Sequence, residues 1–227
     1  MNLHRRLLLA SLPAGLSRPS AAAEDRLESL LSAVGGRAAW AALTGTRNDS
    51  QQNRLDEPVV VRAVIHIDFT RPRVRIDTRA PGLRLARALD GERHWRLARD
   101  GTLGPIPEAV LRDDRRWYAG HVYRTLHRLA ARDPALSVRD AATRRLEVFE
   151  AGQRLAWFDL DSRGEPYVFG AHDDAQGALF GPWAFEVQGI RHPVWVAQRD
   201  GSWRAWLREL EINPAWPPKL FSEPGSG

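Results

Sequence analysis

The sequence contains no cysteine, a single lysine and no long apolar segment after its N-terminal region. The absence of cysteine excludes disulfides, thiolate metal sites and cysteine nucleophiles, and also the lipid-attachment cysteine of a bacterial lipoprotein. No later run of 18 apolar residues could cross a bilayer as a helix. The signatures GxSxG, HExxH, GxGxxG and the P-loop are missing as well. We therefore expect a protein that is not an enzyme, and we assign it no catalytic residue and no cofactor.

The N-terminal region has the features of an export signal. Arg5-Arg6 precede the short apolar run of residues 7–12, and the small residues Ala21-Ala22-Ala23 follow before Glu24. This predicts a cleaved signal over residues 1–23 and a soluble periplasmic protein without a lipid anchor. Two adjacent arginines alone do not distinguish the twin-arginine route from the general one.

The high isoelectric point, about 10.5, has little to do with net charge. Residues 1–23 contain three arginines and no acid, so the remaining chain has 30 basic and 28 acidic residues. Arginine accounts for all but one of the basic residues, and its very high pKa raises the isoelectric point. Basic and acidic residues alternate without forming a basic stripe, so we expect no nucleic-acid partner.

Residues 59–99 have the pattern of an antiparallel meander. Apolar side chains alternate with polar ones over residues 59–69 and 73–79, which is the period of a strand with one buried face. Residues 83–89 and 93–98 are joined by Asp90-Gly91, a pair suited to a tight hairpin turn. Four consecutive strands need a cover for their apolar face.

The remaining residues predict that cover and further strands. Residues 24–34 and 37–43 have helical spacing, residues 44–58 are polar and predict a loop or irregular strand entry, and residues 108–132 predict one long helix ended by Asp133-Pro134. Strands are expected at residues 144–150, 153–160, 167–170, 180–188, 194–198 and 203–212. We therefore expect one α+β domain over residues 24–227, with roughly nine to eleven strands and a Pro-rich tail.

Polar groups with the spacing of a metal or acid–base site are not found. His121 and His127 are six residues apart, so they would not share a helix face. The sequence 172–174, His-Asp-Asp, is typical of a solvated loop. The turn at residues 159–164 begins like a calcium loop, but Arg163 occupies a ligand position and the required glutamate is missing. No metal site is predicted.

Tryptophan is unusually abundant, with nine residues in the chain. Large flat side chains on an inward sheet face either fill a core or line a cavity for an apolar ligand, and the sequence leaves both open. The candidate cavity residues on the strands and the long helix are Ile65, Ile67, Phe69, Leu85, Trp95, Trp117, Tyr118, Trp157, Trp183 and Trp195.

The order of motifs resembles the periplasmic lipoprotein carriers of the LolA/LolB type. A strand ends in Arg71-Pro72, a second begins with residues 73–76 (Arg-Val-Arg-Ile), and a hairpin of the form DGxxxW spans residues 90–95. The segment 35–40 and the Pro-rich ending are also similar to the wider group. This resemblance implies a half-open antiparallel β-barrel whose helices form a lid over an apolar hollow, with Arg71 as a latch on the lid.

Two departures from the carriers concern the ligand. The strands hold many arginines, and the helix of residues 108–132 is longer than the carriers' lid elements. A hollow with basic groups suits a phosphate or carboxylate head. The expected function is thus a non-enzymatic protein that binds a lipid or lipoprotein acyl chain. A second interpretation is an envelope-stress sensor or partner-binding domain that contacts an envelope membrane protein, and a hydrolase or transferase acting on an envelope lipid is a weaker third.

Overall fold

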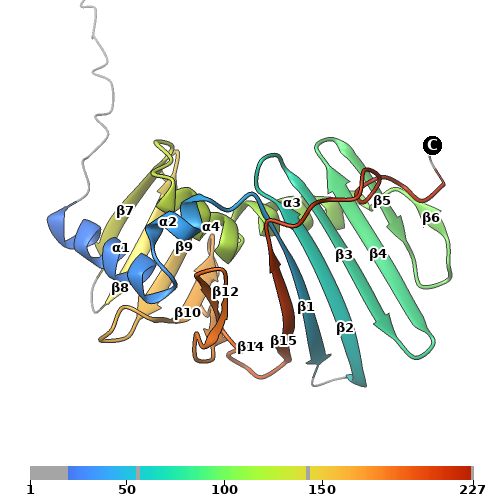
Figure 1. Ribbon diagram of the computed structural model, residues 1–227. Helices are drawn as coiled ribbons and strands as arrows, with labels where there is room; N and C mark the ends of the chain where they lie inside the picture. The colour runs from blue at the N-terminus through green and yellow to red at the C-terminus, as the bar shows by residue number, and fades with distance from the viewer. Residues whose placement is uncertain (1–19, 55–56, 142–143, 226–227) are drawn as a thin grey trace, which may run out of the picture.

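The computed structural model describes residues 20–54, 57–141 and 144–225. These residues form four helices and fifteen strands. Thirteen strands make one antiparallel sheet in the order β6-β5-β4-β3-β2-β1-β15-β14-β11-β10-β9-β8-β7, and β12 pairs with β13 separately (Figure 1). All four helices pack on one face of the large sheet, which we call the inner face. The opposite face is the outer face.

The helices are α1 (Ala21–Ala33), α2 (Arg37–Ala41), α3 (Glu108–Ala119) and α4 (Val122–Ala130). The strands of the first half are β1 (Gly45–Arg54), β2 (Glu57–Asp68), β3 (Arg73–Ala80), β4 (Leu83–Asp90), β5 (Arg93–Leu97) and β6 (Leu103–Gly104). Those of the second half are β7 (Leu136–Ala141), β8 (Arg145–Glu150), β9 (Gln153–Leu160), β10 (Pro166–Ala171), β11 (Ala178–Phe180), β12 (Phe185–Val187), β13 (Ile190–His192), β14 (Trp195–Gln198) and β15 (Trp203–Ile212).

The predicted meander is confirmed as β2 to β5. Ile67, Val74 and Leu89 lie side by side in register on the inner face and are all buried. Gly91, with φ of 63°, provides the left-handed conformation of the β4–β5 turn. The two-residue period of the sequence therefore fixed which side chains face the helices.

Of the two alternatives for residues 44–58, a loop or an irregular strand entry, the loop is wrong, because the segment contains β1, a ten-residue strand paired on both sides. Its partners are β2 and β15, so its backbone hydrogen bonds are made inside the sheet. The strand has no apolar alternation: Thr46, Asn48 and Ser50 point to the inner face, and Arg47 and Asp49 point to the outer face. Pairing and ion pairs, rather than apolar burial, hold it in place.

The predicted helix over residues 108–132 is two helices with a break at Gly120. Glycine has a low helix propensity, and a Cβ at Gly120 would lie 2.8 Å from Nε2 of His172. The imidazole of His121 accepts a hydrogen bond from the Tyr123 N–H at 3.2 Å and so caps the start of α4. This local cap begins a new helix instead of continuing the old one.

The first two helices are confirmed, with α1 starting earlier than expected. Ser20 caps α1, and Ala23 is fully buried in the core. Residues 1–19 of the predicted export signal lie outside the described residues, and its cleavage stays a prediction. Gly35 ends α1 with φ of 118°, at a place where a Cβ would lie 1.9 Å from the Gly189 carbonyl oxygen. A side chain there would force the α1–α2 corner away from the β12–β13 hairpin.

The second half has more strands than expected, and the sheet is open. The predicted strand at residues 180–188 is divided, because the chain leaves the large sheet after β11 and β12 pairs with β13 instead. The two end strands of the large sheet are β6 and β7, at opposite edges. The fold is thus α+β, as predicted, and its thirteen-stranded antiparallel sheet is curved and open, with more strands than the nine to eleven expected.

Two apolar clusters lie on the inner face. The larger joins α1, α2 and α4 to strands β7–β11, and the smaller joins α3 to β2–β4. In Figure 1, α1 and α2 lie at the β7–β9 end, α3 lies behind β1 and β2, and the C-terminal tail crosses in front of them. The polar inner face of β1 separates the two clusters.

Candidate functional site

Five of the predicted cavity residues come together on the inner face. Ile65, Ile67 and Phe69 of the β2 region meet Trp117 and Tyr118 of α3 in the smaller apolar cluster. Ile67 and Tyr118 are buried, whereas the other three are half-buried. The Tyr118 hydroxyl donates to the Asp68 carbonyl at 2.8 Å. That these five residues bind an acyl chain stays a prediction.

The other five predicted residues do not join this group; Trp95, Trp157 and Trp195 face the opposite side of the sheet, because successive strand positions point to opposite faces. Trp183 is buried in the larger cluster, and Leu85 is half-buried on β4. Trp95 and Trp157 are buried on the outer face, where their indole N–H groups donate to the carbonyls of Phe221 and Asp174. Trp195 lies opposite Trp206 in the β14–β15 pair. These ten residues therefore do not line one cavity.

Arg71 lies exposed in the turn between β2 and β3. The contact with α3 is made by its backbone carbonyl, which accepts from the Tyr118 hydroxyl at 3.4 Å. Its guanidinium makes no hydrogen bond or ion pair with any residue that the structure describes. A latch through the Arg71 side chain stays a prediction that the resemblance alone supports.

A different site is formed on the outer face of β1, β2, β3 and β15. Two adjoining hollows of about 310 and 400 Å³ share the side chains of Arg62 and Arg79. The first is lined by Arg47, Arg62, Val64, His66, Arg75, Asp77, Arg79 and Leu220. The second is lined by Gln51, Val60, Val61, Arg62, Arg79, Ala80, Pro81 and Arg208. We call this pair the arginine hollow.

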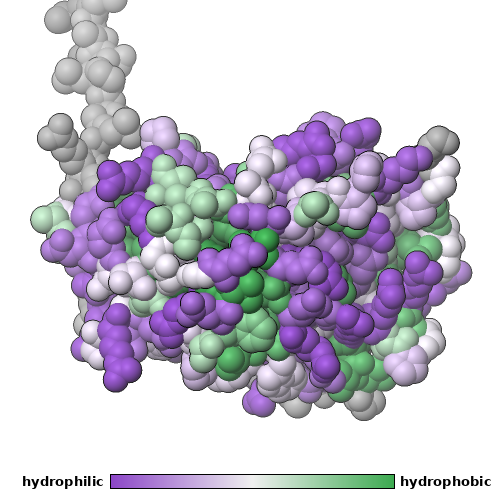
Figure 2. Space-filling model, viewed as in Figure 1, coloured by the Kyte–Doolittle hydropathy of each residue, from purple (hydrophilic) through white to green (hydrophobic). Residues whose placement is uncertain are grey.

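Strand register explains why these arginines gather. Gln51, Arg62 and Arg79 are cross-strand neighbours from β1, β2 and β3, and so are Arg47, His66 and Arg75 four residues further along each strand. Side chains directly opposite on one face lie close together. Figure 2 shows hydrophilic residues gathered over this part of the surface, from β15 to β3.

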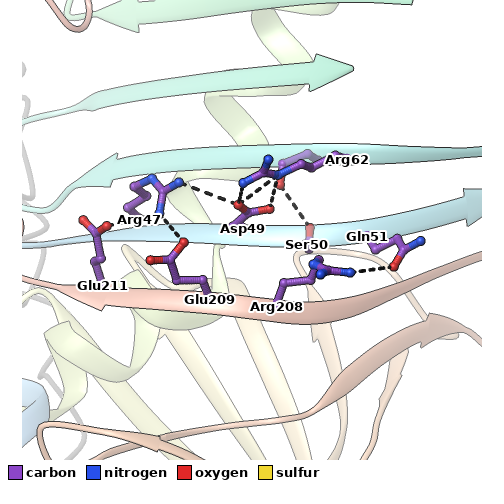
Figure 3. A network of polar contacts seen from close by, with 9 residues as sticks. Arg47, Asp49, Ser50, Gln51, Arg62, Arg208, Glu209 and Glu211 are labelled. Atoms are coloured by element: carbon purple, nitrogen blue, oxygen red, sulfur yellow. Dashed lines mark hydrogen bonds and ion pairs between the residues drawn. The ribbon is translucent and has the colours of Figure 1, made fainter. Parts of the chain in front are cut away.

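Ion pairs hold part of the positive charge (Figure 3). Arg62 donates from Nε to the buried carboxylate of Asp49 at 2.9 Å, and Arg47 contacts Glu209 and Glu211 at 3.0 and 3.1 Å. The hydrogen bond from Arg62 keeps the pKa of Asp49 below its usual value, against the effect of burial. Asp49 thus stays ionised and fixes two arginines at the rim of the first hollow.

Arg75 and His66 complete the first hollow. Arg75 makes a two-pronged ion pair with Asp77 at 2.7 and 2.8 Å and also donates to the Leu220 carbonyl at 2.8 Å. Burial lowers the pKa of His66 to about 4. The imidazole is therefore uncharged at neutral pH and adds no positive charge.

The second hollow has two cations without an ion-pair partner among the described residues. Three arginines line it, of which Arg62 is paired with Asp49, and no carboxylate is among its lining residues. Arg208 donates to the amide oxygen of Gln51 at 3.2 Å, and Arg79 makes no ion pair or hydrogen bond within the described chain. Arginine presents several N–H donors in a planar fork that matches a carboxylate or phosphate. This hollow can therefore bind an anionic group.

Apolar residues also line the second hollow and its surroundings. Val60, Val61, Ala80 and Pro81 contribute to the lining, and Val59 and Val60 are 45% and 46% exposed. Trp206, which pairs in register with Gln51, is 41% exposed. The site thus combines cationic donors with an accessible apolar rim, which suits an anionic amphiphile.

Sequence reasoning noted the strand arginines but did not assemble this site. Arg62 and Arg75 alternate with apolar residues, which is a readable sign of an outer strand face. Arg47 lies in the segment expected to be a loop, and Arg208 lies about 130 residues further along the chain than Arg79. Only the pairing of β1 with both β2 and β15 brings them together.

No family model matches the chain, and no curated protein matches it. Among solved structures, the chain is similar to a DUF1329 family protein from Desulfovibrio piger, with 6% identity and a TM-score of 0.38, over 88% of this chain and 96% of that one. It is also similar to MucB, with 14% identity and a TM-score of 0.30, over 91% of this chain and 65% of MucB. These low scores transfer no function. In the described part of the chain, we find no helix with the length and hydrophobicity of a membrane span.

Proposed function

We propose that this protein is an exported, non-enzymatic binding protein of the cell envelope that holds an amphiphile by its anionic group. The ligand class is a lipid or lipopeptide with a carboxylate or phosphate. The single observation that supports this function is the second hollow, which has three arginines, apolar walls and no lining carboxylate. Burial of an acyl chain contributes about 0.8 kcal/mol per methylene, so shape and charge suffice for affinity without catalytic groups.

The first experiment is native mass spectrometry of the mature protein, purified from periplasm without detergent, followed by lipid extraction. A discrete bound mass that extracts as an acidic lipid or lipopeptide supports the proposal and names the ligand. A mass without ligand, together with a stoichiometric protein partner in a pull-down, favours the partner-binding interpretation, for which the exposed Trp206 would be a contact.

A titration then tests the site itself. Dodecyl phosphate should quench tryptophan fluorescence at lower concentration than dodecanol, because only the phosphate engages the arginines. Arg79→Gln and Arg208→Gln should each weaken dodecyl phosphate binding by about tenfold, since a charge-assisted hydrogen bond contributes about 1.5–3 kcal/mol. Arg112→Gln, at an exposed position on α3, is the matched control and should change nothing. Equal binding of the alcohol and the phosphate would contradict the proposal.

The inner-face group of Ile65, Ile67, Phe69, Trp117 and Tyr118 is a second candidate place for the acyl chain, beneath α3 as a lid. The partial accessibility of Trp117 favours it. If the acyl chain lies there, Trp117→Ala should weaken the binding of dodecanol and of dodecyl phosphate to the same extent. If it lies at the arginine hollow, Trp117→Ala should leave both unchanged.

A further inference from the structure

A cluster of uncharged polar side chains lies on the inner face, away from the arginine hollow. Asn48 of β1 donates from Nδ2 toward Nε2 of His192 on β13 at 3.2 Å. The ring of Tyr123 lies 5.2 Å from that of His192 and 5.3 Å from that of His121, between centroids. Trp117 packs edge-on against His121 at 4.6 Å. We call Asn48, His121, Tyr123 and His192 the amide cluster.

The hydrogen bonds define where the protons lie. Nδ1 of His121 accepts from the Tyr123 backbone N–H, so Nε2 carries the proton in the neutral ring. Nδ1 of His192 faces the Pro193 carbonyl, which requires a proton on Nδ1 and leaves Nε2 to accept from Asn48. Burial lowers the pKa of His121 to about 3 and that of His192 to about 4, so both rings are neutral at physiological pH.

Two polar atoms of the cluster have unused hydrogen-bonding capacity. The hydroxyl of Tyr123, a residue that is only 3% exposed, and Oδ1 of Asn48 have no partner in the described part of the chain. A buried polar atom without a partner is costly, whereas a matching group on a ligand recovers that cost. Asn48, His121 and Trp117 are half-buried and form the exposed edge of the cluster, whereas the two unpartnered atoms themselves are buried.

The chemistry of these atoms selects a class of ligand. The Tyr123 hydroxyl and the Nε2–H of His121 can donate to a carbonyl oxygen, and Oδ1 of Asn48 can accept an N–H. A carboxylate would leave Asn48 unpaired and would find no cation among these four residues. An ester offers a carbonyl but no donor. In the described residues no group of three histidines and acids gathers as a metal site.

We propose that the amide cluster is a binding site for a neutral secondary amide, such as the linkage of an N-acyl group or a peptide bond. The adjoining Trp117 and the apolar cluster under α3 would receive the carbon chain of such a ligand. This site is separate from the arginine hollow, which faces the opposite side of the sheet.

The test compares N-hexylacetamide with hexyl acetate, which share the same chain and differ in the N–H. Binding is followed by the ¹⁵N signals of His121, His192 and the Trp117 indole in the full-length protein. The amide should bind about tenfold more tightly, because a site built for a hydrogen bond discriminates against an analogue that lacks the group.

Tyr123→Phe removes only the unpartnered hydroxyl, so the variant should fold normally. It should weaken amide binding about fivefold to tenfold. The matched control is Tyr167→Phe, at an exposed position on β10 outside both proposed sites, and it should leave amide binding unchanged. Equal affinities for the two probes, no shift of the histidine signals, or an unchanged affinity in Tyr123→Phe would each overturn the proposal. Arg79→Gln should leave amide binding unchanged, so the two proposed sites fail or succeed independently.

Discussion

Individual arginine–carboxylate pairs stabilise the outer face of the sheet. Asp68 is 1% exposed and accepts from Nε of Arg73 at 2.8 Å and from the Thr70 hydroxyl at 2.6 Å. The hydrogen bonds from Thr70 and Arg73 keep the pKa of Asp68 below its usual value, although burial alone, the largest single effect, acts in the opposite direction. Such pairs explain how a sheet face rich in arginine folds at neutral pH.

His66 makes stability depend on pH in a defined range. Burial is the main cause of its lowered pKa, about 4; the nearby Asp77 opposes the shift, and Arg75 and Arg47 increase it. In the unfolded chain the pKa returns to about 6.5, so the unfolded state binds the proton first as pH falls. Stability from this residue is present above pH 6.5 and is lost between about 6.5 and 4.

We predict that the free energy of unfolding, measured by urea denaturation at pH 7, 6 and 5, decreases with acidification. His66→Gln should reduce the slope of the free energy of unfolding against pH by up to about 1.4 kcal/mol per pH unit. The remaining slope should come from His121 and His192, whose pKa values are lowered in the same direction. A slope identical in the variant and the parent would show that His66 titrates normally in the folded protein.

At the scale of elements, α3 is held on the sheet by its apolar contacts and by ion pairs, of which the one made by Asp114 is the most buried. Asp114 is 7% exposed and accepts from Nε and Nη2 of Arg87 on β4 at 2.7 and 3.0 Å. Leu111 and Tyr118 bury the apolar side of the helix against β2–β4. The helix is thus positioned by a charged contact at its middle and apolar contacts toward both ends.

We predict that Arg87→Met destabilises the protein by about 1–3 kcal/mol, because it leaves the Asp114 carboxylate buried without its partner; the value allows for partial exposure of Arg87. The double variant Arg87→Met/Asp114→Leu should recover much of that loss, because no buried charge remains. Urea denaturation of the two single variants and the double variant gives the coupling energy. Additive effects would mean that the pair does not position α3.

The helices and strands differ in how well the sequence predicts them. The meander and the first two helices were predictable, because apolar periodicity in them is strong and local. Strand β1 was missed, since Thr46, Asn48 and Ser50 take the inner positions where apolar residues are usual. The break at Gly120 was missed, because it depends on the contact with His172 and the cap made by His121.

On the scale of the whole molecule, the C-terminal tail joins distant strands across the outer face (Figure 1). Asn213 accepts from the Thr44 N–H at 2.7 Å, Trp216 lies against Gly45 and His66, and Phe221 is buried. The Phe221 carbonyl accepts from the indole of Trp95 at 2.9 Å. The tail therefore covers Trp95 and forms a wall of the first hollow through Leu220.

We predict that truncation after Asn213 lowers the free energy of unfolding by about 2–4 kcal/mol, since it removes the burial of Phe221 and uncovers Trp95. Tryptophan emission should shift to longer wavelength as the indole becomes hydrated. Truncation after Ser222, which keeps Phe221, is the control and should have little effect. If both truncated chains are as stable as the full chain, the tail is not part of the folded core.

The sequence by itself determined the class of the protein, because composition and local periodicity are properties of short segments. It indicated an α+β domain, the meander, the helices that cover it and the absence of cysteine chemistry. Tertiary structure alone decided the sites. Alternation on the strands sends Trp95 and Trp157 to the outer face and away from the inner group. Pairing of β1 with β2 and β15 assembles the arginine hollow, and packing of α4 and β13 over β1 brings His121, His192 and Asn48 together. Because these contacts join residues far apart in the chain, no local sequence pattern predicts them.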